Sequence, residues 1–224
     1  MPINIAMDGP VGAGKSTIAD CVANALGILH LDTGAMYRAV GVTALKRGID
    51  PCDEEKVTEM CRSLVLDVSY AKDGQHTYAD GEDVTGILRT EEASMAASKV
   101  ATYPGVRAQM VEAQQRMAKN HDMLVDGRDI GTRVLADAPV KIYLTASPEV
   151  RARRRYLQLQ EKGTSDTYEK VLADLIERDR QDMNRKTDPL RKAEDAVEVD
   201  TSELTFDESV QEILRIVKEA LGVG

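Results

Sequence analysis

Residues 9–16 have the composition and spacing of a phosphate-binding loop. They read GPVGAGKS, which fits the pattern G-x-x-x-x-G-K-[ST]. Glycines let such a loop curl so that its backbone N–H groups point at phosphate oxygens, and the helix that follows adds its positive N-terminal end. Lys15 would reach the β- and γ-phosphates, and the Ser16 hydroxyl can coordinate Mg²⁺. The pattern predicts a nucleoside triphosphate site formed by Gly9, Pro10, Val11, Gly12, Ala13, Gly14, Lys15, Ser16 and Thr17.

Polar side chains also follow two other predicted strands. DTG follows the apolar run at 28–31, and DGRD follows the apolar run at 123–125. Ligands of open α/β sheets bind at the carboxyl ends of the strands, so these side chains should gather beside the phosphate loop. They are Thr33, Arg38, Asp126, Arg128 and Asp129. The chain lacks the Asn-Lys-x-Asp sequence that guanine recognition usually requires, which disfavours a GTP-dependent switch.

Arginines are concentrated again late in the chain. The sequence VRARRR supplies Arg151, Arg153, Arg154 and Arg155. In the helix expected over 168–185, spacings of four and three place Arg178, Asp182 and Arg185 on one face. Two arginines held by a carboxylate suit planar phosphate oxygens, although a solvated, salt-bridged face is the alternative interpretation. The phosphate loop favours the first, with residues 154–168 as a lid that closes over ATP and excludes water.

Alternating strands and helices must position these residues. Parallel strands joined by helical crossovers are indicated by the apolar runs at 3–7, 28–31, 123–125, 140–144 and 196–199. The predicted fold is a single α/β domain, residues 1–224, with a doubly wound five-stranded parallel sheet and helices on both faces. Residues 64–86 break the alternation, because Asp73-Gly74 and Asp80-Gly81 are hairpin signals. We expect a small antiparallel insert there.

The composition excludes several classes of protein. A net charge of −9 disfavours a nucleic-acid binder or a binder of anionic membranes. No run approaches the ~20 apolar residues of a membrane span, and the N-terminus lacks signal-peptide features, so we expect a cytoplasmic location. The cysteines and histidines show no metal-ligand spacing, and His30 is interpreted as a packed side chain within a strand. We expect a monomer, since no long exposed apolar helix stands out.

Taken together, the motifs resemble those of a known family. DGPVGAGKST, LDTGAMYR, VDGRDIGT, LQLQEKG and RDRQDMNR, in this order, closely resemble bacterial cytidylate kinases. These nucleoside monophosphate kinases phosphorylate CMP and dCMP from ATP, and the similarity spans nearly the whole chain. The resemblance implies that the β insert enlarges the monophosphate-binding subdomain. It assigns the acceptor nucleotide to Thr33, Arg38, Ser98, Arg107, Arg128, Asp129, Arg178, Asp182 and Arg185.

The resemblance also implies a role for each side chain. Arg38, Arg128 and Arg185 would clamp the CMP phosphate. Arg178 and Asp182 would approach the sugar. The groups expected to act on the transferred phosphoryl group are Lys15, Arg128, Arg154 in the lid and Arg185, with Asp126 and Ser16 near Mg²⁺.

Ser98, Arg107 and Asp129 would recognise the cytosine base, while Thr33 would form a hydrogen bond with the acceptor nucleotide. Cytosine offers an N4 amino donor beside the N3 and O2 acceptors, which suits a carboxylate next to an arginine. Uracil has an O4 acceptor and an N3–H donor in the corresponding positions, so the same carboxylate would face a lone pair. A mismatched buried polar group costs roughly 1–3 kcal/mol, so cytosine should be preferred by about tenfold or more.

The expected chemistry is electrostatic. The acceptor is already an anionic phosphate, so no strong general base is needed, and cations offset the repulsion between the two nucleotides. Two alternatives stay open at this point. One is a kinase for UMP or for a metabolite hydroxyl, which would call for a base. The other is a nucleotide-dependent binding protein, which would hydrolyse ATP slowly and show no stimulation by CMP.

Overall fold

The main sheet is parallel and five-stranded. A computed structural model describes residues 2–71 and 74–222. Within these residues the strand order is β2-β6-β1-β7-β8, and all neighbours are parallel. The strands are β1 (Asn4–Asp8), β2 (Leu29–Asp32), β6 (Met123–Gly127), β7 (Val140–Thr145) and β8 (Val197–Asp200). Each predicted strand is present, and the predicted α/β fold class is confirmed.

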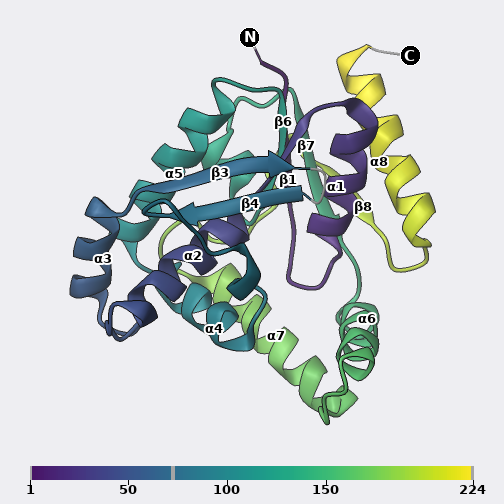
Figure 1. Ribbon diagram of the computed structural model, residues 1–224. Coiled ribbons are helices and arrows are strands. Elements are labelled where there is room, and N and C mark those ends of the chain that lie inside the picture. The colour runs from purple at the N-terminus through teal and green to yellow at the C-terminus, as the bar shows by residue number, and fades with distance from the viewer. Residues whose placement is uncertain (1, 72–73, 223–224) are drawn as a thin grey trace.

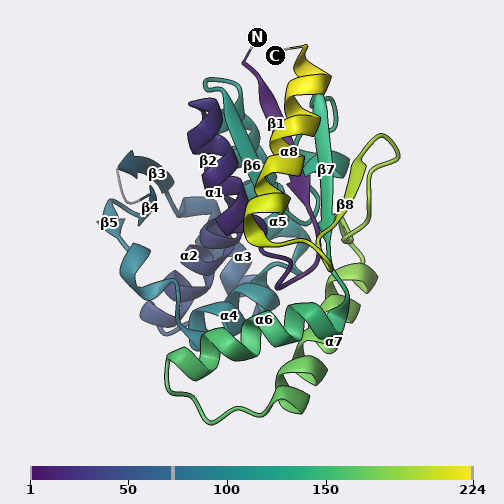
Figure 2. The ribbon, with the colours of Figure 1, turned by 90° about the vertical axis from the view of Figure 1, so that its right-hand side faces the viewer.

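Helices cover both faces of this sheet (Figures 1 and 2). Side chains alternate across a strand, so Ile5 and Met7 of β1 enter one apolar cluster and Ala6 enters the other. The first cluster is closed by α1 (Lys15–Leu26) and α8 (Phe206–Leu221). The second is closed by α2 (Thr33–Lys46), α3 (Glu54–Ser63), α4 (Glu91–Val100) and α5 (Pro104–Ala118).

The predicted insert is a separate antiparallel sheet. It consists of β3 (Leu66–Ala71), β4 (Gly74–Ala79) and β5 (Glu82–Asp83), followed by the short helix η1 (Thr85–Ile87). The turn between β4 and β5 is Asp80-Gly81, and both residues have positive φ, 51° and 81°, as two-residue hairpin turns require. The turn expected at Asp73-Gly74 includes residue 73, which lies outside the described residues.

A helical hairpin lies beyond the carboxyl ends of the main strands (Figure 2). It is formed by α6 (Pro148–Glu161) and α7 (Tyr168–Asn184), which share a small apolar cluster of Ala152, Val171 and Leu175. α7 ends at Asn184, one residue earlier than predicted, and Arg185 already has extended backbone angles. The predicted lid, 154–168, covers the second half of α6 and the connection to α7. No helix in the described part of the chain combines the length and apolar character needed to cross a membrane.

The cysteines should differ sharply in reactivity. Cys61 is buried in the core, and burial raises the pKa of its thiol to about 11, whereas Cys52 is exposed. Since the thiolate is the reactive form, we expect a maleimide at about pH 8 to label Cys52 at least about tenfold faster than Cys61. Time-resolved peptide mass spectrometry measures both rates. The urea-unfolded chain is the control, in which the rates should converge. Equal rates in the native protein would contradict the buried position of Cys61.

Candidate active site

The phosphate-binding loop connects β1 to α1 in the conformation its glycines allow. Gly12 and Gly14 have φ of 75° and 86°, in the left-handed region that glycine tolerates. Gly9 is required for a different reason. A Cβ at this position would lie 1.9 Å from the carbonyl oxygen of Leu144 in β7. The loop is therefore fixed by close approach to the sheet as well as by backbone freedom.

The helical hairpin also holds this loop. The Val11 N–H donates to Asp179 Oδ1 at 3.3 Å, and Arg151 Nη1 donates to the Val11 carbonyl at 2.9 Å. Arg151 and Asp179 are themselves paired at 2.7 Å, and both are buried. α6 and α7 thus contact the loop through a buried ion pair, which fixes the position of Val11.

Lys15 is buried within the loop that it belongs to. Its ammonium donates to the Pro10 carbonyl at 2.8 Å. Burial and the nearby Arg128 guanidinium lower the pKa of Lys15 to about 7, and Asp126 opposes the shift. The charged ammonium is therefore disfavoured mainly by its loss of water, which an anionic ligand would compensate.

A chain of polar groups runs from the start of α1 into the end of β6. The Ser16 hydroxyl donates to Asp126 Oδ2 at 2.8 Å. His30 Nε2 lies 3.3 Å from Asp126 Oδ1, and His30 Nδ1 lies 2.5 Å from Asp20 Oδ1. Burial lowers the pKa of His30, but hydrogen bonds to Asp126 and Asp20 outweigh it and raise the pKa to about 10. His30 is packed within β2, as predicted, and the carboxylates on either side of its ring favour its charged form.

Ser16 and Asp126 fit the ligand requirements of Mg²⁺. The ion prefers oxygen ligands and usually takes only one or two from protein, with water and phosphate completing its shell. The two side chains offer a hydroxyl and a carboxylate oxygen within hydrogen-bonding distance of each other, and Ser16 is exposed next to the loop.

Asp8 ties β1 to the turn that follows β6. Its two carboxylate oxygens accept the backbone N–H groups of Ile130 and Gly131, each at 2.7 Å. Burial raises the pKa of Asp8 to about 6, and the two N–H donors limit the rise. The turn continues as a short helix, η2 (Ile130–Val134), so Asp8 fixes the start of this helix and the residues just before it.

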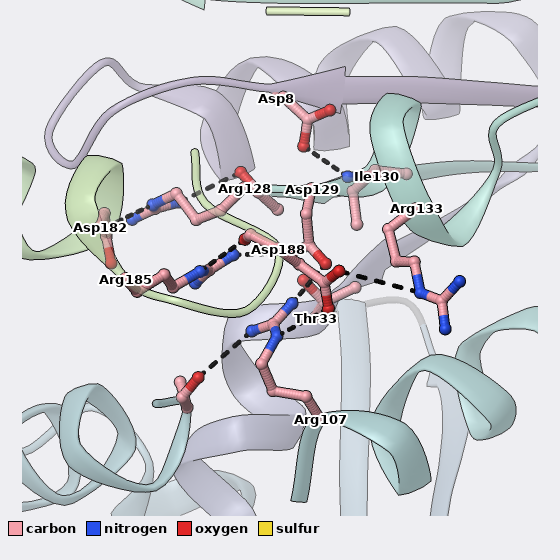
Figure 3. A network of polar contacts seen from close by, with 12 residues as sticks. Asp8, Thr33, Arg107, Arg128, Asp129, Ile130, Arg133, Asp182, Arg185 and Asp188 are labelled. Carbon is pink, nitrogen blue, oxygen red and sulfur yellow. Dashed lines mark hydrogen bonds and ion pairs between the residues drawn. The ribbon is translucent and has the colours of Figure 1, made fainter. Parts of the chain in front are cut away.

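Arg107, Asp129 and Arg185 form a buried network (Figure 3). Asp129 Oδ2 accepts a hydrogen bond from Arg107 Nη2, and Oδ1 accepts one from Arg185 Nη2 at 3.1 Å. Side-chain exposure is 2%, 7% and 6% in that order, so the charges are withdrawn from water. Arg107 also lies over the ring of Tyr37, at 5.6 Å from its centroid. The predicted base-reading pair Arg107 and Asp129 is thus in direct contact.

The other predicted arginines divide differently from expectation. Asp182 Oδ2 accepts a hydrogen bond from Arg128 Nε at 2.9 Å. This carboxylate on α7 therefore fixes the arginine that directly follows β6. Arg178 makes no side-chain hydrogen bond or ion pair to any residue the structure describes. Burial and the nearby charge of Arg128 lower the pKa of Arg178, and Arg38 contributes to this effect. The charge of Asp182 opposes this lowering, so Arg178 lies near charges of both signs, whereas Arg185 is hydrogen-bonded to Asp129.

Arg38 and Thr33 have partners at the ends of β2 and β6. Arg38 Nη2 donates to Asp32 Oδ2 at 2.8 Å, and Asp32 also caps α2. The buried Thr33 hydroxyl donates to the Asp126 carbonyl at 2.7 Å, which leaves its lone pairs as acceptors. Ser98 lies half-buried on α4, a helix packed against α2.

Arg154 lies apart from the predicted cluster. Its guanidinium donates to the Thr201 carbonyl at 2.7 Å and to the Thr201 hydroxyl at 3.1 Å, in the loop before α8. The expected grouping of Arg154 with Arg128 and Arg185 is therefore not seen in this structure. Among its neighbours, Arg153 lies over Tyr156, and Arg155 contributes to the lowered pKa of Arg178.

Comparison with known proteins identifies the family. The model of the cytidylate kinase family matches residues 5–219. A cytidylate kinase of Caldicellulosiruptor bescii is 47% identical over 214 residues, covering 96% of this chain and 95% of that protein. A cytidylate kinase of Bacillus subtilis is 44% identical over 217 residues, covering 97% of each. The chain belongs to the cytidylate kinase family. It is accordingly a nucleoside monophosphate kinase, with ATP as the phosphoryl donor that such kinases use.

Solved structures show the same fold with little sequence similarity. A shikimate kinase from Bacteroides thetaiotaomicron superposes with a TM-score of 0.51 at 14% identity and covers 99% of each chain. An uncharacterized protein from Eubacterium ventriosum gives a TM-score of 0.55 at 10% identity, covering 96% of this chain and 98% of the other. At these identities the likeness shows only that this cytidylate kinase family member has the P-loop kinase fold.

Sequence reasoning missed the residues that support the site. Asp8 precedes the phosphate loop and could have been found from its position at a strand end. Arg151 is one of the four neighbouring arginines that the sequence singles out, but no local pattern distinguishes it from the other three, or Asp179 from exposed carboxylates of its helix. The same applies to Asp20 and Asp188, whose partners lie on other elements.

The pairing of His30 predicts a pH-dependent contribution to stability. Its pKa is about 10 in the folded protein against 6.5 when unfolded, so the stabilisation is full below 6.5 and is lost as pH rises towards about 10. We expect His30→Gln to lower the free energy of unfolding by about 1.5–3 kcal/mol at the acidic end of this window. The deficit should shrink towards its alkaline end.

Urea unfolding without added metal, at several pH values, measures this difference. His121→Gln is the matched control, because His121 is exposed. Its free energy of unfolding should follow that of the unmodified protein throughout. A deficit for His30→Gln that is the same at both ends of the window would show that His30 carries no charge in the folded protein.

Proposed function

We propose that the enzyme transfers the γ-phosphoryl group of ATP to CMP and dCMP, giving CDP and dCDP. The observation that carries this proposal is the contact between Arg107 and Asp129, next to the cluster of Arg38, Arg128 and Arg178. The first pair suits a base with adjacent donor and acceptor groups, and the cluster suits a phosphate. The named relatives are cytidylate kinases, in agreement with this assignment.

The acceptor base is read by hydrogen-bond polarity. Asp129 takes the N4 amino group of cytosine, and Arg107 donates to its ring acceptors, with Ser98 beside them. Uracil would set its O4 lone pairs against the Asp129 carboxylate. Because Asp129 is buried, water cannot compensate for the mismatch, which costs roughly 1–3 kcal/mol.

The remaining site residues offset negative charge. Lys15 turns from the Pro10 carbonyl to the β- and γ-phosphates of ATP, and the backbone of residues 9–14 binds the phosphate oxygens. Ser16 and Asp126 would hold Mg²⁺, which would supply positive charge to the phosphates of ATP. Arg38, Arg128 and Arg178 bind the acceptor phosphate, and Asp182 holds Arg128 in place. Arg185 holds the Asp129 carboxylate beside the base.

No general base is assigned, because the attacking oxygen of CMP is already anionic. The protein must bring the phosphate of CMP and the γ-phosphate of ATP together and align them. It must also stabilise the negative charge on the phosphoryl group during transfer. We further propose that residues 154–168 close over the bound nucleotides and exclude water, so that ATP is not hydrolysed. The enzyme is expected to act as a monomer in the cytoplasm.

The acceptor range tests the proposed activity. We expect ADP formation from ATP and Mg²⁺ to be fast with CMP and dCMP, and at least about tenfold less efficient with UMP, because of the base mismatch. A coupled assay of ADP with CMP, dCMP, UMP, AMP and no acceptor in turn measures this. Equal rates with and without CMP would indicate a nucleotide-dependent switch, and a preference for a hydroxyl acceptor would indicate another kinase.

Arg178 tests the acceptor-phosphate site. We expect Arg178→Ala to lower kcat/KM for CMP by about 10- to 100-fold, because a hydrogen bond between charged groups is lost, while KM for ATP stays within about twofold. Arg180→Ala is the matched control on the same helix, since Arg180 is exposed and paired only with Glu177 among the described residues. A loss confined to ATP would place Arg178 in the donor site instead.

A further inference from the structure

Asp188 occupies an unusual position after the end of α7. Its φ is +46°, a left-handed backbone conformation that residues other than glycine rarely adopt, although Asp and Asn tolerate it. Pro189 follows and further restricts the backbone before it. The loop is held by Leu190, whose N–H donates to the Asp182 carbonyl at 2.9 Å and whose side chain is buried. The strained conformation is thus imposed by its surroundings, which is typical of residues with a functional constraint.

Asp188 contacts three arginines (Figure 3). Its Oδ2 accepts from Arg107 Nε at 3.0 Å, and its backbone carbonyl accepts from Arg185 Nε at 2.6 Å. Its Oδ1 lies 3.8 Å from Nε of Arg133, which is largely exposed. Arg107 and Arg185 are the two arginines that hold the oxygens of Asp129, so Asp188 contacts both partners of this carboxylate.

The contact with Asp188 determines which donors of Arg107 remain for a ligand. A guanidinium has five N–H groups in a plane. In Arg107, Nε donates to Asp188, Nη1 to the Ala101 carbonyl at 3.3 Å and Nη2 to Asp129. One N–H on each Nη is left over. Because the Nε bond fixes rotation of the guanidinium plane, it also fixes the direction in which these two N–H groups point.

Asp188 also balances the charge of the network. Arg107 and Arg185 are two buried cations that cannot lose their protons, and Asp129 alone supplies one negative charge. The carboxylate of Asp188 makes the group of four neutral. Without it, two guanidinium groups would compete for the same carboxylate in a buried site, where the repulsion between them is poorly screened. Asp129 would then have no single preferred orientation.

We propose that Asp188 is a positioning residue for recognition of the acceptor base. It orients Arg107 directly, and through Arg107 and Arg185 it orients the Asp129 carboxylate that distinguishes cytosine from uracil. The proposal rests on the proposed cytidylate kinase activity and adds a residue that does not itself touch the base. Its signature is a loss of discrimination between bases, rather than a uniform loss of activity.

Two substitutions test this role without introducing backbone strain. Asp188→Asn is nearly isosteric and tolerates the left-handed conformation, but it loses the charge and one acceptor oxygen. Asp188→Gly adopts the same backbone freely and removes the side chain. Arg133→Ala is the matched control, because it breaks the other ion pair of the same carboxylate without touching Arg107 or Asp129. Thermal melting of each variant checks that it is folded.

The measured quantity is the ratio of kcat/KM for CMP to that for UMP, with ATP saturating. We expect both Asp188 variants to lower this ratio by about tenfold, mainly through a higher KM for CMP, with KM for ATP within about twofold. Arg133→Ala should retain the original ratio. If the two Asp188 variants keep the ratio, even with lower kcat or melting temperature, Asp188 is merely structural and the inference is wrong. If the unmodified enzyme shows no preference for CMP, it is the proposed function that fails.

Discussion

The hydrogen bonds from Ile130 and Gly131 to Asp8 join the two parts of the site. β1 leads into the phosphate loop, and β6 beside it leads into Arg128 and Asp129. Parallel pairing sets the two strand ends next to each other but leaves the turn after β6 free to take several paths. Asp8 removes this freedom, because its two oxygens satisfy two backbone N–H groups that would otherwise be buried without partners. The raised pKa of Asp8 reflects the burial that this arrangement requires.

Buried arginines need carboxylates, and their pairing divides the acceptor side into two kinds of surface. Arg107 and Arg185 are neutralised by Asp129 and Asp188, which makes that part of the site rigid and polar without net charge. Arg178 has no described ion-pair partner and faces the charge of other arginines. A neutral, oriented surface suits an uncharged base, and an arginine whose side chain makes no described hydrogen bond or ion pair suits a phosphate. The two surfaces lie side by side because they are built on neighbouring elements.

The sequence predicts the strands and the phosphate loop well, for physical reasons that are local. Apolar runs and glycine spacing are set by neighbouring residues, so β1, β2 and the loop at 9–16 follow directly from the pattern. The pairing of charges is not local. Helical spacing places Asp182 on one face with Arg178 and Arg185, but it does not reveal that Asp182 binds Arg128, which lies 54 positions away.

The same limit explains the different positions of the neighbouring arginines. Arg151 is buried against the phosphate loop and Arg154 contacts the loop before α8, although both come from one run of basic residues. Arg151 and Arg154 are almost one turn apart along α6, so their side chains reach different segments of the chain, and the run has no single function. The surroundings of His30 are equally hidden in the sequence. The histidine lies in an apolar strand, and only the fold brings Asp20 and Asp126 close enough to favour its charged form.

α7 contacts both halves of the site, and this constrains how the helical hairpin can move. Asp179 binds the Val11 N–H of the phosphate loop, whereas Asp182, less than one turn later, binds Arg128 at the end of β6. Beyond the helix, Asp188 reaches the base-reading pair. The second half of α7 is therefore anchored both to the phosphate loop and to the end of β6. The proposed closure of residues 154–168 takes place relative to this anchored half, so that the free end of the hairpin moves without disturbing Arg107, Arg128 and Asp129.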